Sequence, residues 1–116
     1  MSKPDSFSQR KNRSAVTPFE VKGSISVDGD KKSSVVLVWN ISDTGLCIWS
    51  DGKFKKGGEV TFKIEHPWRA VFECEVMWTR SVPDRSGYIL GLQVANDIEG
   101  LIAIHKEVVK KQKKAG

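Results

Sequence analysis

Apolar and polar residues alternate along most of this chain. From Phe19 to Val27 the odd positions are apolar or glycine and the even positions are mostly polar, a pattern typical of a half-buried strand. Later apolar runs or alternating stretches lie at 35–39, 46–49, 60–64, 70–78 and 90–94. Turn-forming residues separate them, beginning with Asp28-Gly29-Asp30. The pattern therefore predicts six strands.

The spacing of apolar residues changes from two to three or four near residue 97. The residues that recur at this spacing are Ile98, Leu101, Ile102, His105 and Val109. This period predicts a helix over about 97–112, followed by a short basic tail at 113–116. Asn96 or Asp97 can cap the helix, and Glu99 three residues after Asn96 resembles a capping box.

Short antiparallel strands followed by one helix predict a mainly β protein. The expected fold is a six-stranded antiparallel β-barrel with a C-terminal α-helix packed on it, since closure removes exposed strand edges. The chain of 116 residues suits one domain, which we place at 17–112. Residues 1–16 are polar and without periodicity, so we expect a flexible basic N-terminal arm.

Positive charge gathers at the two ends of the chain. The net charge is +5, and four cations precede residue 17 against the single acid Asp5. Five lysines from Lys106 onward oppose only Glu107. Such ends suit an anionic partner, although lysines also suit the negative end of a helix dipole. No apolar run is long enough for a membrane span and residues 1–5 carry no secretory signal, so we expect no membrane insertion and a cytoplasmic location.

Nothing in the sequence favours catalysis. The two cysteines and two histidines are isolated from one another, without metal-ligand spacing, and no nucleophile elbow or phosphate loop is present. Cys47 and Cys74 are expected to be small core side chains. His105 fits a packed helix residue better than a general base. We therefore expect no enzyme, no metal and no cofactor.

A polar hexapeptide at 40–45 interrupts two apolar runs. Its pattern is Asn-x-Ser-x-x-Gly, formed by Asn40, Ser42 and Gly45. Asn and Ser stabilise tight turns and Gly supplies a positive φ, so the residues have a sufficient structural explanation. Arg10 and Arg13 precede the turn and suggest that it also has a function. Arginine matches phosphate oxygens and stacks on bases, so an arm carrying two of them could close on a ligand at the turn.

This order of motifs resembles the PilZ domain family, whose pattern is Arg-x-x-x-Arg, a spacer, and Asp/Asn-x-Ser-x-x-Gly. The segment Tyr88–Val94 is also similar to the family's final strand. The resemblance implies a six-stranded barrel, a C-terminal helix and an arm that closes on cyclic di-GMP. It also implies roles for the predicted site residues Arg10, Arg13, Asn40, Ser42, Gly45 and Trp78. The arginines would grip phosphates and guanine faces, and the turn would seat the ligand.

The same family includes members in which an aromatic residue near the end of the fifth strand stacks on guanine. Trp78 stands at that place, but its alternation with Phe72 and Val76 equally favours the core. A departure from the pattern lies at Gln9, four residues before Arg13, where the family has arginine. Arg10 could compensate for it.

The alternative is a degenerate adaptor that acts through protein contacts without cyclic di-GMP. In either case we expect a downstream protein partner, an output such as motility, pilus or biofilm formation, and a monomer or weak dimer. Binding of single-stranded nucleic acid is less favoured because Phe62, Phe72 and Trp78 are expected to share inward faces.

Overall fold

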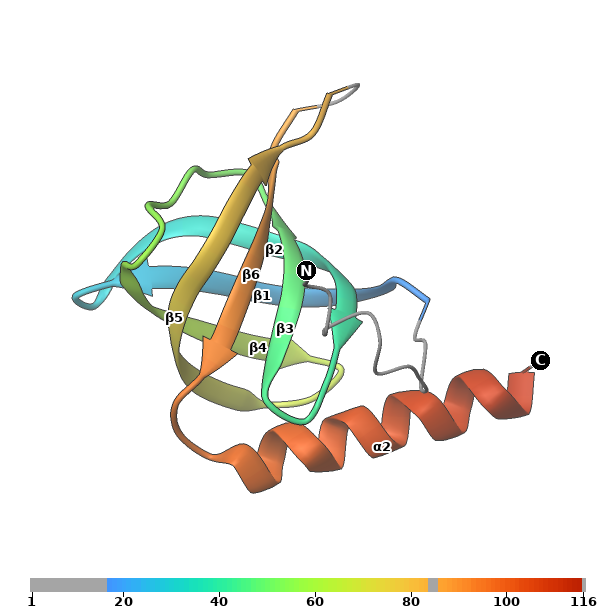
Figure 1. Cartoon of the computed structure of the whole chain (residues 1–116). Coiled ribbons are helices and arrows are strands. Elements are labelled where there is room, and N and C mark those ends of the chain that lie inside the picture. Colours follow the sequence, from blue (N-terminus) through green and yellow to red (C-terminus); the bar gives the residue numbers. More distant parts are fainter. Residues whose placement is uncertain (1–16, 84–85, 116) are drawn as a thin grey trace, which may run out of the picture.

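The computed structural model describes residues 17–83 and 86–115, with side chains as far as Gln112. Along the chain it contains β1 (Phe19–Val27), β2 (Asp30–Ile41), β3 (Gly45–Ser50), β4 (Glu59–His66), β5 (Ala70–Ser81), β6 (Tyr88–Val94) and α2 (Ile98–Ala115). Figure 1 shows the six strands wrapped around one another and α2 lying across one end of them. The helix extends beyond its expected end near 112.

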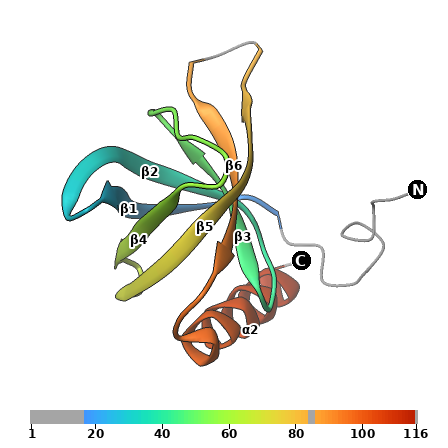
Figure 2. The ribbon, with the colours of Figure 1, turned by 60° about the vertical axis from the view of Figure 1, so that its left-hand side comes forward.

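The strands form a closed barrel in the order β1-β2-β3-β6-β5-β4, and every neighbouring pair is antiparallel. The predicted mainly β fold, a six-stranded antiparallel barrel with a C-terminal helix, is therefore confirmed. Two views of the ribbon show β3, β6 and β5 side by side on one wall of the barrel (Figures 1 and 2). The predicted arm at 1–16 lies outside the described residues.

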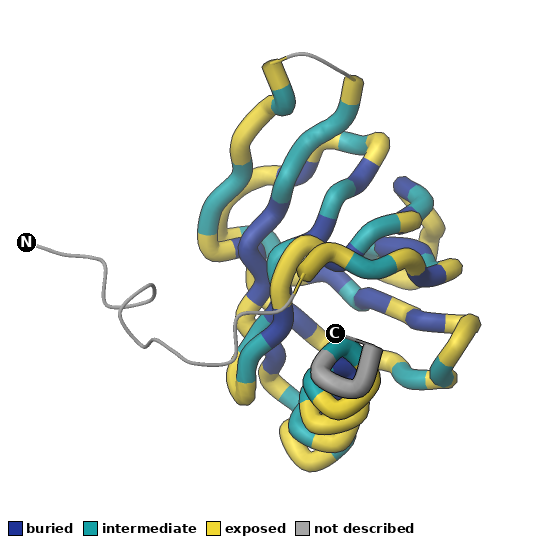
Figure 3. Tube along the Cα trace, turned by 90° about the vertical axis from the view of Figure 1, so that its right-hand side faces the viewer, coloured by how far each residue is buried: buried dark blue, intermediate teal, exposed yellow. Residues whose placement is uncertain are grey.

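Apolar side chains from all six strands fill the barrel. Phe62, Phe72, Ile25, Ile48 and Leu90 are among those completely shielded from solvent. Buried and exposed residues alternate along much of the tube in Figure 3, as expected when one face of each strand points inward. Each large apolar side chain buried in this way contributes about 1.5–3 kcal/mol relative to an exposed one.

The helix α2 covers one end of this core with a narrower stripe than the sequence indicated. Its buried apolar residues are Leu101, Ile104 and Val108, which join the barrel core. Ile98, expected on the buried face, is instead exposed. A stripe with spacing three and four fits either set of positions, so the pattern alone did not define the rotation of the helix.

The start of α2 is capped by Asp97. The backbone N–H of Gly100 donates to Asp97 Oδ1 at 3.2 Å. Asn96 has a different role, because its side chain accepts from Glu73 N at 2.6 Å and donates to Val71 O at 3.4 Å. The expected capping box is therefore wrong, and Asn96 instead fastens the helix entry to β5.

A second attachment of α2 involves Trp68 in the β4–β5 connection. The indole N–H of Trp68 donates to Glu107 Oε1 at 2.5 Å, and Lys111 Nζ lies 5.8 Å from the centre of the ring. Phe19 packs edge-on against the same ring, with ring centres 5.8 Å apart. Trp68 thereby joins the middle of α2 to the start of β1.

Candidate functional site

A cavity of about 490 Å³ lies beside the β2–β3 turn and the wall formed by β3, β6 and β5. Four of the residues singled out in the sequence line it, namely Asn40, Ser42, Gly45 and Trp78. They come from two segments separated by more than thirty residues, and the closed barrel brings them together. The remaining predicted site residues, Arg10 and Arg13, lie outside the described residues.

A β-bulge in β5 brings Trp78 to this wall. Val76 pairs with Leu92 and Trp78 pairs with Gly91, so Met77 is an additional residue between two consecutive positions of β6. The insertion reverses the alternation, because one extra residue moves every following side chain to the opposite face. Trp78 therefore points outward, and the prediction that it shares an inward face with Phe72 is wrong.

The residue after the bulge supports this assignment. Thr79 pairs with the buried Leu90, and its Oγ1 is buried without a hydrogen-bond partner among the described residues. An inward Thr79 requires an outward Trp78, since successive side chains of a strand point to opposite faces. One argument made against nucleic-acid binding, an inward Trp78, is lost with this finding.

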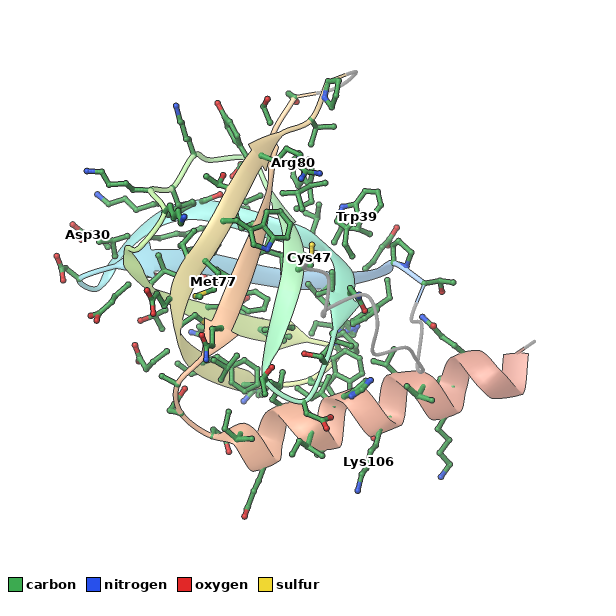
Figure 4. The ribbon with its side chains drawn as sticks, viewed as in Figure 1. Asp30, Trp39, Cys47, Met77, Arg80 and Lys106 are labelled. Atoms are coloured by element: carbon green, nitrogen blue, oxygen red, sulfur yellow. The ribbon has the colours of Figure 1, made fainter. Side chains whose placement is uncertain are left out.

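The indole ring of Trp78 covers Gly91 of the neighbouring strand. A Cβ atom at position 91 would overlap the ring, so the absence of a side chain there provides its seat. The guanidinium carbon of Arg80 lies 5.7 Å from the ring centre, within range of a cation–π interaction. Figure 4 shows Cys47 and Met77 on the same face of the barrel, with Arg80 farther along β5. A flat apolar ring beside a cation suits a planar, electron-rich ligand.

Ser42 holds the turn of the hexapeptide. Its backbone N–H donates to Gly45 O at 2.9 Å, and its Oγ accepts from the N–H groups of Thr44 and Gly45 at 3.3 and 3.2 Å. Asn40 Oδ1 accepts from Ile41 N at 2.8 Å, and no hydrogen bond within the described chain involves its side-chain nitrogen. Ser42 therefore shapes the turn, while Asn40 retains donors for a ligand.

Glycine is needed at position 45 for a different reason from the expected positive φ. Its φ is not positive, unlike those of Gly29, Gly57 and Gly87. Instead, a Cβ atom at position 45 would overlap the carbonyl oxygen of Leu92. The motif glycine thus lets β3 approach β6 closely at the edge of the cavity.

His105 joins the hexapeptide turn to α2. Its Nδ1 lies 3.2 Å from Asp43 Oδ1, and the His105 side chain is 13% exposed against 70% for Asp43. The expectation of a packed helix residue agrees with this burial. The contact with Asp43 was not visible in the sequence, because the two residues are 62 positions apart.

Sequence analysis missed several residues that line the cavity. Cys47 was expected in the core, but it is only half-buried and lines the cavity from β3, the strand between β2 and β6. Met77 and Gln93 also line the cavity. Burial raises the pKa of the Cys47 thiol to about 11, with Arg80 acting in the opposite direction, so the thiol is neutral at physiological pH. The alternation of β3 could have revealed Cys47, since Leu46 and Ile48 flank it on the inward face.

Two further tryptophans lie on this side of the barrel. Trp39 is a bulge residue of β2 and is 37% exposed. Trp49 follows Ile48 on β3, donates from Nε1 to Ser86 O at 3.2 Å and covers Gly87. The outer face of β2 and β3 therefore carries aromatic side chains, which the apolar composition alone does not indicate.

Comparison with known families identifies the class of protein. The PilZ domain model matches residues 8–105, which includes the polar hexapeptide, the barrel strands and the first part of α2. The chain belongs to the PilZ domain family. Its members are generally non-catalytic receptor domains that bind cyclic di-GMP and act through partner proteins. Searches of curated proteins and of solved structures gave no match.

Two further properties concern the described part of the chain. Across residues 17–83 and 86–115, no helix is both long and apolar enough to cross a membrane. Over the same residues, no group of three or more His, Cys, Asp and Glu side chains is placed to hold a metal ion.

Proposed function

We propose that this protein is a non-catalytic cytoplasmic receptor for cyclic di-GMP. The observation that carries the proposal is the gathering of Asn40, Ser42, Gly45 and Trp78 around one cavity of about 490 Å³ on a PilZ barrel. That volume lies within the range of small-molecule sites, roughly 300–1,000 Å³. The cavity combines an apolar ring with a small number of polar groups, as ligand sites commonly do.

Each group has a distinct part in binding. One guanine base stacks on Trp78, where Arg80 adds positive charge at the edge of the ring. The free side-chain N–H donors of Asn40 reach acceptors on the base, and Ser42 and Gly45 keep the turn in place. Arg10 and Arg13 of the arm supply the charge-assisted contacts to the phosphates.

Closure of residues 1–16 on the ligand is the proposed signal. A segment that becomes ordered on binding changes the surface that a partner protein meets, a common form of molecular switch. The output, such as motility, pilus or biofilm formation, would depend on that partner. We place no metal or further cofactor in this mechanism.

Isothermal titration with cyclic di-GMP tests the proposal, with GTP and a short single-stranded oligonucleotide as control ligands. The wild-type chain should bind cyclic di-GMP selectively. Arg13→Ala should weaken binding about ten- to hundredfold, since hydrogen bonds to charged groups contribute about 1.5–3 kcal/mol. Lys11→Ala is the matched control, because it removes one positive charge from the same arm. Equal losses in both variants would contradict a specific phosphate clamp.

A further inference from the structure

Gln93 lies next to the Trp78 ring on the outer wall of the barrel. It follows Gly91 by two residues on β6, the strand between β3 and β5, and the indole covers Gly91 (Figure 1). Alternate residues of a strand point to the same face and are about 6.5 Å apart, so the Gln93 side chain begins beside the ring. Gln93 and Trp78 both line the cavity.

The neighbours of Gln93 leave its carboxamide open. On β3 it pairs with Gly45, which has no side chain, and on β5 it pairs with the exposed Glu75. The carboxamide of Gln93 takes part in no hydrogen bond within the described part of the chain, and the residue is exposed. Its carbonyl oxygen therefore keeps its capacity to accept, and its nitrogen keeps two donors.

Asn40 approaches the same ring from another direction. The strand register places Asn40 opposite Cys47 and Cys47 opposite Gly91. Neighbouring strands are about 4.8 Å apart, so Asn40 lies about 10 Å across the sheet from Gly91, whereas Gln93 lies along the strand. Asn40 Oδ1 already accepts from Ile41 N at 2.8 Å, which leaves the side-chain nitrogen as the free group. The cavity thus offers donors from Asn40 and an uncommitted acceptor from Gln93.

Guanine has two edges that match this arrangement. Its N7 and O6 atoms are acceptors on one edge, and its exocyclic 2-amino group is a donor on another. A guanine that stacks on Trp78 and accepts from Asn40 needs an acceptor elsewhere around the ring for its 2-amino group, and Gln93 supplies one. Adenine has an amino donor beside N7 and no 2-amino group, so it fits the same side chains less well.

We infer that Gln93 is a specificity-determining residue, whose carbonyl oxygen accepts a hydrogen bond from the 2-amino group of guanine. This contact distinguishes guanine from purines that lack the group, such as hypoxanthine and adenine. A site that hydrogen-bonds a ligand N–H disfavours the analogue without it, because a polar group of the site then loses its partner. The inference rests on the proposed function, because it concerns the base that stacks on Trp78 in the same cavity.

Two substitutions and one altered ligand test the inference. Gln93→Met keeps a side chain of similar length but removes the carbonyl oxygen, whereas Gln93→Glu keeps an acceptor at the same place. The altered ligand is cyclic di-IMP, the inosine analogue of cyclic di-GMP, which keeps N7 and O6 and lacks the 2-amino group. Val71→Met is the matched control, because it places methionine at an exposed position of β5 that does not line the cavity.

Titration calorimetry measures both ligands on each full chain, and circular dichroism confirms that each variant is folded. The wild-type chain should bind cyclic di-GMP about three- to tenfold more tightly than cyclic di-IMP, as expected for one hydrogen bond. Gln93→Met should lose this preference by weakening cyclic di-GMP binding alone. Gln93→Glu should retain the preference, although its negative charge weakens the binding of both anionic ligands. Val71→Met should behave as the wild-type chain does.

Failure of the inference and failure of the proposed function give different results. Unchanged cyclic di-GMP affinity in Gln93→Met, or equal weakening of both ligands, would overturn the contact with the 2-amino group. The same loss in Val71→Met would also overturn it. In each of these cases, wild-type binding of cyclic di-GMP leaves the proposed receptor intact. A folded wild-type chain that binds neither ligand would overturn the proposed function, and the inference with it.

Discussion

The ring of Trp78 occupies the space above Gly91 that a side chain would otherwise fill. The two residues pair across β5 and β6 immediately after the bulge at Met77. Bulge and glycine act together, since the first turns the ring outward and the second gives it a surface on which to lie flat. The ring is thus already placed beside the cavity, which would lower the cost of stacking a base on it in the proposed receptor.

Gly91→Ala should displace the Trp78 ring and weaken cyclic di-GMP binding. The added methyl group would overlap a rigid indole next to the backbone, so the ring has to move away. We expect an affinity loss of at least about fivefold, comparable to the 1–3 kcal/mol of a base–aromatic stack, and a change in tryptophan fluorescence. Circular dichroism should confirm that the barrel remains folded.

A double-mutant cycle supplies the control for this variant. If Gly91 acts through the indole, then Gly91→Ala should have little further effect on affinity in a Trp78→Ala background. Additive losses would show that Gly91 affects the cavity independently of Trp78.

Ser42→Ala should destabilise the protein by weakening the hexapeptide turn. The hydroxyl accepts from two backbone N–H groups, at Thr44 and Gly45, which lose this partner in the variant. Loss of a hydrogen bond of this kind costs about 0.5–1.5 kcal/mol. Urea unfolding measures the stability, and Thr44→Ala serves as the control because it alters the same turn without removing the hydroxyl of residue 42. An unchanged midpoint for Ser42→Ala would contradict the assignment.

Alternation and turn signals were sufficient to predict the barrel, because inward residues such as Phe62 and Phe72 keep a strict period of two. The same rule failed for Trp78, since the bulge at Met77 inserts one residue and leaves no mark in the sequence. Bulges depend on pairing between strands, which a local pattern does not contain.

The contacts between α2 and the rest of the protein could not be predicted from the sequence pattern either. Asp43 and His105 are 62 positions apart, and Thr17 and Gln112 are 95 apart. Neither pair has a spacing that indicates contact. The helix was predicted from its period, but its rotation depends on these polar contacts and on the burial of residues such as Leu101.

Gln9→Arg should distinguish a receptor from an adaptor. The substitution restores the family's Arg-x-x-x-Arg pattern with Arg13. If Arg10 already supplies the phosphate contact, the variant should change the cyclic di-GMP affinity by less than about threefold, because the site gains no missing interaction. Titration calorimetry measures it, with Gln9→Lys as a control for charge alone. Binding that appears only in Gln9→Arg would instead favour the adaptor.

Cys47 offers a direct report on occupancy of the cavity. Burial raises its pKa to about 11 and that of the core residue Cys74 to about 12, both from 9.0. The thiolate is the reactive form, so iodoacetamide should label Cys47 slowly at neutral pH and faster as the pH rises toward 11. Cyclic di-GMP should slow the labelling of Cys47, which lines the cavity, while Cys74 stays protected throughout.

The same pKa values predict how stability changes in alkali. Between the unfolded value of 9.0 and the folded value of about 11, the unfolded chain has released the Cys47 proton and the folded chain retains it. Stability associated with the neutral thiol is therefore complete below pH 9.0 and is lost as the pH rises toward 11. Cys47→Ser should make stability fall less steeply over this range in urea unfolding, because a serine hydroxyl does not titrate there, while Cys74, with its pKa raised to about 12, continues to contribute. A wild-type profile that is already flat would contradict the burial of Cys47.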